Sequence, residues 1–173
     1  KDIAVEFTSM SKTYSMAGWR MGFAVGNPTL IAALTRVKSY LDYGAFTPIQ
    51  VAATAALNGP QDFVTRNKAI FQGRRDLVVS MLNQAAGIKC PVPEGAFYVY
   101  PSIAGLIGKT TESGVVIDGD STFAAELLNA EGVAVVQGVA YGMSPYFRAS
   151  FVAPEADLVR GGDLIQQACA ALT

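Results

Sequence analysis

The sequence predicts an α/β protein, in which short strands and helices alternate along the chain. Of the 173 residues, 51% are hydrophobic and 16% are charged, which supplies enough apolar material for a packed core and too little charge for a disordered chain. Short runs of β-forming residues alternate with longer runs of helical periodicity, several of which open on capping residues. The length fits one domain or two small ones.

The first elements are two strands and two helices. Strands are predicted at residues 3–8 and 21–25, because both runs are short and rich in β-forming residues. Asn27 is expected to cap a helix whose first residue is Pro28, and Thr47 is expected to cap a second helix in the same way.

A long amphipathic helix is predicted over residues 61–86, and short strand-like runs appear after it. The remaining expected elements are strands at residues 88–90, 96–100, 133–136 and 146–152, and helices at residues 122–130 and 155–172.

Charge and hydropathy exclude several classes of partner. The net charge is −1, from 13 basic and 14 acidic residues, so the chain has no basic field to attract nucleic acid or anionic lipid. No apolar stretch reaches the length of a membrane span, and the opening residues lack the apolar core of a signal peptide. We therefore expect no nucleic-acid partner and no membrane partner.

The chain contains no histidine, which excludes Ser-His-Asp and Cys-His nucleophiles and histidine-ligated zinc. Cys90 and Cys169 cannot form a four-thiolate metal site, so no metal is expected. A single disulfide is open to them, but two isolated cysteines favour a reduced, buried pair in a cytoplasmic protein.

A polar segment at residues 9–20 follows the first predicted strand. It places Lys12 shortly after the strand end and Arg20 eight residues later, and it contains the hydroxyls of Ser9, Ser11 and Ser15. Arginine, hydroxyls and backbone N–H groups bind phosphate, and a lysine beside such a site forms a Schiff base where its pKa is lowered. The alternative, which spacing alone favours, is a solvated turn with two surface cations.

The run Ser-x-Ser-Lys-x-Tyr-x-Met-x-Gly-Trp-Arg-x-Gly, which starts at Ser9, resembles the lysine motif of class I/II (fold-type I) pyridoxal-phosphate-dependent aminotransferases. Further segments resemble the family in the same order, at residues 43–50, 93–99, 131–138 and 147–151. Gln137 departs from the family, which usually has proline there.

The resemblance implies the C-terminal part of a fold-type I transferase. Residues 1–72 would be the end of the large α/β domain that binds the cofactor, and residues 73–173 would form the small α+β domain. The long helix would bridge them. Because family chains are much longer, the first two strands are expected to belong to a larger sheet and to leave apolar surface and open edges here.

The same resemblance implies roles for five residues. Lys12 matches the residue that forms the Schiff base with pyridoxal phosphate and moves the substrate proton, while Ser9 and Arg20 match phosphate ligands. Thr47 matches a position that reaches the cofactor phosphate of the partner subunit, although a plain helix cap explains it equally well. Arg148 matches the residue that binds the substrate α-carboxylate; taken alone, it would be an exposed arginine on an edge strand.

The implied activity is amino-group transfer between an L-amino acid, with aspartate the best match, and a 2-oxo acid such as 2-oxoglutarate, by a ping-pong mechanism in a homodimer. The segments are most similar to bacterial aspartate aminotransferases. An alanine or aromatic aminotransferase, a relative that catalyses β-elimination or decarboxylation, and a non-catalytic domain fragment are the alternatives. The isolated chain is expected to be inactive.

Overall fold

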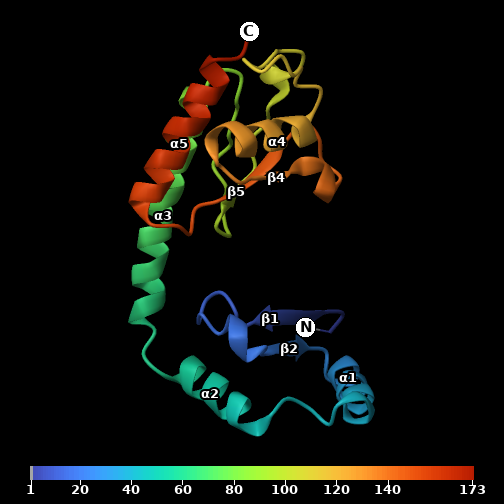
Figure 1. Ribbon diagram of the computed structural model, residues 1–173. Helices are drawn as coiled ribbons and strands as arrows, with labels where there is room; N and C mark the ends of the chain where they lie inside the picture. Colours follow the sequence, from blue (N-terminus) through green and yellow to red (C-terminus); the bar gives the residue numbers. More distant parts are fainter. Residues whose placement is uncertain (1) are drawn as a thin grey trace. The chain divides into compact units, whose positions relative to one another are not determined.

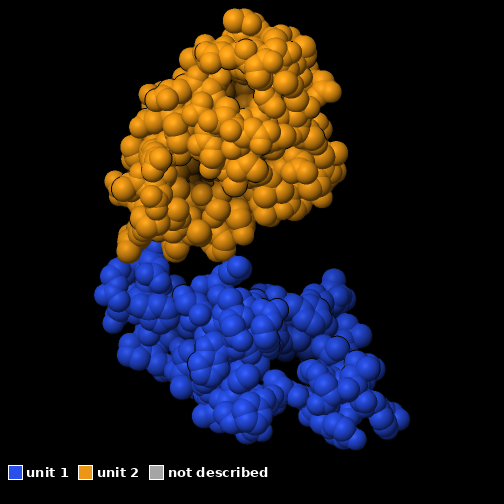
Figure 2. Space-filling view, in the orientation of Figure 1, with its two compact units in different colours: residues 1–67 blue, residues 68–173 orange. Residues whose placement is uncertain are grey.

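A computed structural model describes residues 2–173, and the chain divides into two compact units. Unit 1 comprises residues 1–67 and unit 2 comprises residues 68–173 (Figure 2). Both units contain helices and an antiparallel sheet, which confirms the predicted mixture of helix and strand. No helix in the described part of the chain has the length and apolar character needed to cross a membrane.

Unit 1 is built on an antiparallel pair of strands, β1 (Val5–Ser9) and β2 (Gly22–Gly26), with Ser9 opposite Gly22 (Figure 1). A short 3-10 helix, Ala17–Trp19, lies between them in sequence. Two helices follow, α1 (Pro28–Leu41) and α2 (Thr47–Asn58).

The start of α1 is as predicted, because the Asn27 side chain accepts hydrogen bonds from Thr29 N at 2.9 Å and Leu30 N at 3.1 Å. Pro28 stands in the first turn, where its missing N–H has no bond to lose. The apolar side of this helix is nevertheless exposed: Val37 is 56% and Leu41 is 78% accessible. The apolar surface predicted for the two strands is present as well, since Phe7 of β1 is 71% and Val25 of β2 is 50% accessible.

The core of unit 1 is small and surrounds the polar segment that carries Lys12. Met10 and Met16 are buried and pack with Ala53 of α2. Because these two methionines lie on either side of Lys12 in sequence, their burial fixes both ends of the turn that presents it.

The long helix α3 (Asp62–Gln84) runs from the end of unit 1 into unit 2, within the predicted range. In unit 2 it packs against α5 (Glu155–Ala170), where Gln166 Nε2 donates to Met81 O at 2.8 Å. A Cβ on Gly162 would lie 2.6 Å from Met81 Cε, so this glycine permits the close approach of the two helices.

Unit 2 contains a three-stranded antiparallel sheet in the order β3-β5-β4, with β5 (Phe147–Ser150) in the centre. The outer strands are β3 (Tyr98–Val99) and β4 (Val136–Gln137). Helix α4 (Asp120–Glu131) and the 3-10 helices Ala104–Leu106 and Gly138–Tyr141 complete the unit (Figure 1).

The strands of unit 2 are shorter than predicted. Ala96 has a left-handed backbone, with φ of 59°, which delays β3 until Tyr98. Residues 88–90 contribute only an isolated bridge between Lys89 and Ser102. Residues 133–135 lie outside any strand and contribute to the unit by packing Val133 and Val135 against its core.

The core of unit 2 gathers residues from α3, α4, α5, β3 and β5. Its centre includes Phe147 and Phe151, which are 0% and 1% exposed, and Leu82 from α3. Cys90 and Cys169 are both buried in it as free thiols, as predicted, and burial raises the pKa of each to about 11. Neither is a reactive thiolate at neutral pH.

Candidate active site

The Lys12 turn is held by its own backbone and by buried neighbours. Met10 N donates to Met21 O at 3.0 Å, and Met16 N donates to Met10 O at 3.3 Å, which closes the segment into a loop at the end of β1. Within it Ser15 N donates to Lys12 O at 3.3 Å. The Lys12 side chain is exposed.

Ser9 and Arg20 line one hollow of about 520 Å³ at the end of the β1–β2 pair. Ser11 and Lys38 line it too, and no aspartate or glutamate does. With Thr8, the hollow has two cations and three hydroxyl side chains on otherwise apolar walls, and this polar set without a carboxylate suits an anion such as a phosphate group. Lys38 also pairs with Asp42 at 2.6 Å, so Arg20 is the principal cation of this hollow. Sequence reasoning missed Lys38, which comes from α1 and gives no local signal.

Arg20 is held in an unusual backbone conformation. Its φ of 52° and ψ of 46° are left-handed, and Ser15, on the other side of the 3-10 helix, has φ of 54°. Non-glycine residues in this region carry strain and cluster at functional sites. One guanidinium nitrogen, Nη1, donates to Ala17 O at 2.9 Å, which fixes the side chain and leaves its other donors for a ligand.

Thr47 is the first residue of α2 and not its cap. The N-cap is Phe46, which makes no side-chain hydrogen bond, so the prediction that Thr47 caps this helix is wrong. The chain enters the helix one residue earlier than the Thr-Pro pattern suggests, because Pro48 tolerates either of the first positions. Thr47 is exposed, and it does not line the hollow that contains Ser9 and Arg20.

Arg148 lies in unit 2, in the central strand of the sheet, opposite Val136 of β4. The edge-strand alternative is therefore wrong. Its Cζ lies 4.5 Å from the ring centroid of Tyr98 and 4.6 Å from that of Tyr141, so two aromatic rings contact the guanidinium. Among residues 2–173, no carboxylate lies within 4.0 Å of it. A half-buried guanidinium without an acidic partner suits an external carboxylate.

Asp120, which sequence reasoning missed, is a buried carboxylate near this arginine's aromatic contacts. It is 2% exposed, accepts a hydrogen bond from Val139 N at 2.6 Å and accepts another from the Ser144 hydroxyl. Burial raises the pKa of Asp120, but these bonds and those from the backbone N–H groups of Asp120 and Gly138 outweigh it and hold the pKa below its ordinary value. Its stabilising contribution is present at neutral pH and is lost as the pH falls through that lowered pKa.

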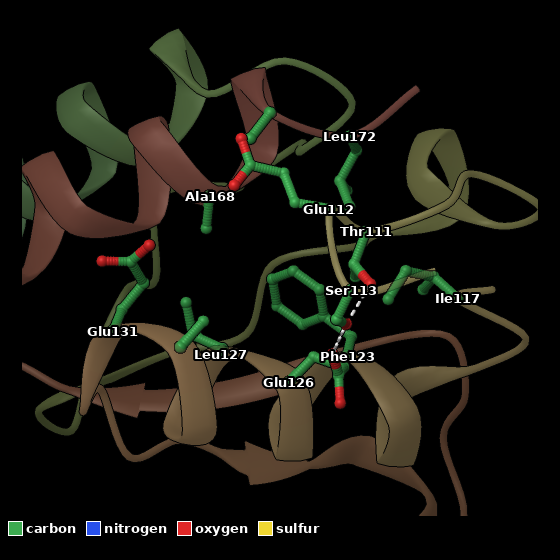
Figure 3. Close-up of a pocket in the computed structure, with 12 residues that line it drawn as sticks. Thr111, Glu112, Ser113, Ile117, Phe123, Glu126, Leu127, Glu131, Ala168 and Leu172 are labelled. Carbon is green, nitrogen blue, oxygen red and sulfur yellow. Dashed lines mark hydrogen bonds between the residues drawn. The ribbon is translucent and has the colours of Figure 1, made fainter. Parts of the chain in front are cut away.

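A second pocket, of about 410 Å³, lies in unit 2 between α4, α5 and the segment before α4 (Figure 3). Phe123 and Leu127 of α4 give it an apolar wall, and Glu112, Glu126 and Glu131 line it as well (Figure 3). None of the five predicted site residues lines it. Three carboxylates disfavour a phosphate or a carboxylate ligand, so this pocket is not the phosphate site.

Comparison with known proteins gives consistent matches along the chain. The family described as aminotransferase class I and II matches residues 1–161. A probable aspartate/prephenate aminotransferase of Rhizobium leguminosarum bv. phaseoli is 54% identical over 170 residues, which is 98% of this chain and 42% of that protein. An aspartate/prephenate aminotransferase of Cereibacter sphaeroides is 48% identical over 99% of this chain and 43% of its own length.

Solved structures of aminotransferases are also similar to this chain. The crystal structure of the aspartate aminotransferase from Rhizobium meliloti has a TM-score of 0.93 at 45% identity, over 98% of this chain and 42% of that one. An alanine aminotransferase from Pyrococcus furiosus has a TM-score of 0.83 at 28% identity, over 96% of this chain and 42% of its own. The chain therefore spans less than half the length of these relatives, and it belongs to the class I and II aminotransferases.

Proposed function

We propose that this chain carries the lysine, phosphate-binding and carboxylate-binding residues of an amino-acid aminotransferase that exchanges amino groups between aspartate and 2-oxoglutarate. The observation that carries the proposal is the placement of Lys12 on a fixed turn, next in sequence to the carboxylate-free hollow that Ser9 and Arg20 line. The names of the similar proteins from Rhizobium and Cereibacter favour aspartate over alanine, because those proteins are the more similar ones.

Pyridoxal 5′-phosphate is the proposed cofactor, and the hollow fits its phosphate in charge and in hydrogen-bond donors. When bound, this group supplies the electron sink that stabilises negative charge at the substrate Cα. Lys12 would hold it covalently, and Ser9 and Arg20 would bind its phosphate. We propose that Thr47 reaches the phosphate bound by the partner subunit of a homodimer.

Proton transfer and substrate binding are assigned to two different residues of the chain. Lys12 Nζ takes the proton from the substrate Cα and returns it at the next step, which supplies a general base to a chain without histidine. Arg148 binds the substrate α-carboxylate through two parallel N–H donors, and the rings of Tyr98 and Tyr141 hold its guanidinium in place. Residues 1–72 would complete the cofactor-binding domain and residues 73–173 would form the small domain. The isolated chain is proposed to be inactive.

The activity is testable in a hybrid enzyme, in which residues 1–173 replace the matching 42% of the Rhizobium meliloti aspartate aminotransferase. We expect the hybrid enzyme to form oxaloacetate and glutamate from aspartate and 2-oxoglutarate. A hybrid that folds and forms neither product would leave the chain as a non-catalytic fragment. Ammonia release without glutamate formation would instead indicate elimination chemistry.

Replacing Arg148 by leucine in the hybrid enzyme should raise KM for aspartate and for 2-oxoglutarate by about 100-fold, because two hydrogen bonds to a charged group are lost. Both substrates carry the α-carboxylate, so both KM values should rise together. Arg160→Leu is the matched control, since Arg160 is exposed on α5. Steady-state kinetics check this, and equal KM values in the Arg148→Leu variant and the parent would contradict the role of Arg148.

A further inference from the structure

Asp120 is the one polar or charged residue of the described chain that is buried, and its charge is balanced by hydrogen bonds. No lysine or arginine lies within 4.0 Å of it among residues 2–173. Burying a carboxylate without a cation costs folding free energy unless hydrogen-bond donors satisfy both of its oxygens. Two donors to Asp120, Val139 N and the Ser144 hydroxyl, belong to one turn, which connects β4 to β5.

The two oxygens of Asp120 bind the two ends of that turn. Oδ2 accepts from Val139 N at 2.6 Å, and Oδ1 accepts from the Ser144 hydroxyl. The turn closes on itself through Met143 N, which donates to Gly138 O at 3.1 Å. Tyr100, just after β3, supports the turn as well, because its hydroxyl donates to Gly138 O at 3.2 Å. The start of α4 is thereby fixed to the turn.

Tyr141 lies inside this turn, between the two anchored ends. Its ring is one of the two that contact the Arg148 guanidinium, at 4.6 Å. The other ring, Tyr98, is positioned by the pairing of β3 with β5, in which Tyr98 is opposite Ser150. Tyr141 lies in no strand and is 50% exposed; its ring meets that of Tyr100 edge to face at 6.4 Å, and its backbone is held by the turn.

We infer that Asp120 is a positioning residue for substrate binding: by anchoring residues 139 and 144 it holds Tyr141 against Arg148 and so fixes the guanidinium for a carboxylate. That Arg148 binds a substrate carboxylate rests on the proposed function. The link from Asp120 to Arg148 rests on two hydrogen bonds and one ring contact. Asp120 itself does not touch the substrate. Its removal should therefore act on carboxylate affinity through the position of one ring.

The test uses the 173-residue chain and NMR of the Arg148 side chain. Rings stacked on a guanidinium displace the resonances of the Arg148 Nε–H and δ-methylene protons upfield. Asp120→Ala is expected to move these resonances back toward those of an unstacked arginine, because the turn loses both anchors. Asp120→Asn is expected to keep most of the displacement, since its amide oxygen accepts from Val139 N and its NH₂ donates to the Ser144 hydroxyl.

Asp118→Ala is the matched control. Asp118 is exposed and bonds the Thr122 hydroxyl at the start of the same helix, so this variant removes a local contact of α4 and leaves the turn anchored. If Asp120→Ala does not fold, Ser144→Ala removes one anchor alone. It should move the Arg148 resonances a shorter way back toward those of an unstacked arginine. Native Arg148 resonances in a folded Asp120→Ala or Ser144→Ala chain would overturn the inference.

Succinate, a dicarboxylate probe, separates this inference from the proposed function. Its Kd for the hybrid enzyme, measured by calorimetric titration, should rise roughly tenfold in Asp120→Ala, the effect of losing one well-placed cation–π contact, and stay unchanged in Asp118→Ala. A folded parent hybrid enzyme that binds no succinate would contradict the proposed role of Arg148. The resonance displacement would still decide whether Asp120 positions that arginine.

Discussion

Replacing Lys12 by alanine is expected to lower the kcat of the hybrid enzyme by about 10³-fold or more, because the variant loses both the covalent attachment and the base that moves the substrate proton. The free energy of unfolding should change by less than about 1 kcal/mol, since the Lys12 side chain is exposed and the turn is held by the buried Met10 and Met16. Single-turnover kinetics with aspartate, followed by urea unfolding, measure the two effects separately.

Lys68→Ala is the control for Lys12, because Lys68 is an exposed lysine on α3 outside both the hollow and the turn. Its kcat should equal that of the parent. Lys12→Arg keeps a positive charge at the same place and should be as inactive as Lys12→Ala, since a guanidinium neither attaches to a carbonyl nor accepts a proton. An active Lys12→Arg variant would assign an electrostatic role to this position.

The largest expected effect on stability is that of Gly138→Ala. A Cβ at Gly138 would overlap the Met143 carbonyl oxygen and would lie 2.6 Å from Tyr146 O. Both atoms are backbone, so neither can move without breaking the turn that Asp120 anchors. We expect unit 2 to lose about 3 kcal/mol of unfolding free energy, which urea unfolding followed by far-UV circular dichroism would measure.

Gly119→Ala is the matched substitution for Gly138→Ala. Gly119 precedes α4 and has an extended backbone, and a Cβ added to it would have no neighbouring atom within 4 Å. Its unfolding free energy should fall by only about 1 kcal/mol, because alanine is a poorer N-cap than glycine but meets no steric overlap here. A Gly138→Ala chain as stable as Gly119→Ala would mean that the turn moves freely. Such a turn could not hold Tyr141 in place through Asp120.

The helices could be predicted from sequence because their signals are local, whereas the role of the lysine segment rests on the family resemblance, since its spacing alone favours a solvated turn. Asn27 caps α1 through N–H groups two and three residues away, so the pattern and the structure coincide. The short strands could not be bounded in this way, since β3 and β4 exist only where they pair with β5. The Thr47 cap failed because a Thr-Pro pair fits two helix starts that differ by one residue.

The contacts of Arg148 could not be predicted from the sequence, because they too are formed only by tertiary structure. Tyr98 and Tyr141 are 50 and 7 residues from Arg148 in sequence, and only the folded sheet and turn bring their rings to its guanidinium. Asp120 gives no signal in the sequence that separates it from Asp118, since both stand at the start of the same helix. Its burial depends on the turn between β4 and β5, which tertiary packing sets.

Lys12 is proposed to hold the cofactor, and this assignment can be measured directly. The direct measurement is to incubate the hybrid enzyme with pyridoxal phosphate, reduce it with borohydride and map the modified peptides by mass spectrometry. We expect one modified lysine, Lys12, and no such modification in Lys12→Ala. Modification at other lysines in place of Lys12, or none at all in an active hybrid enzyme, would contradict it.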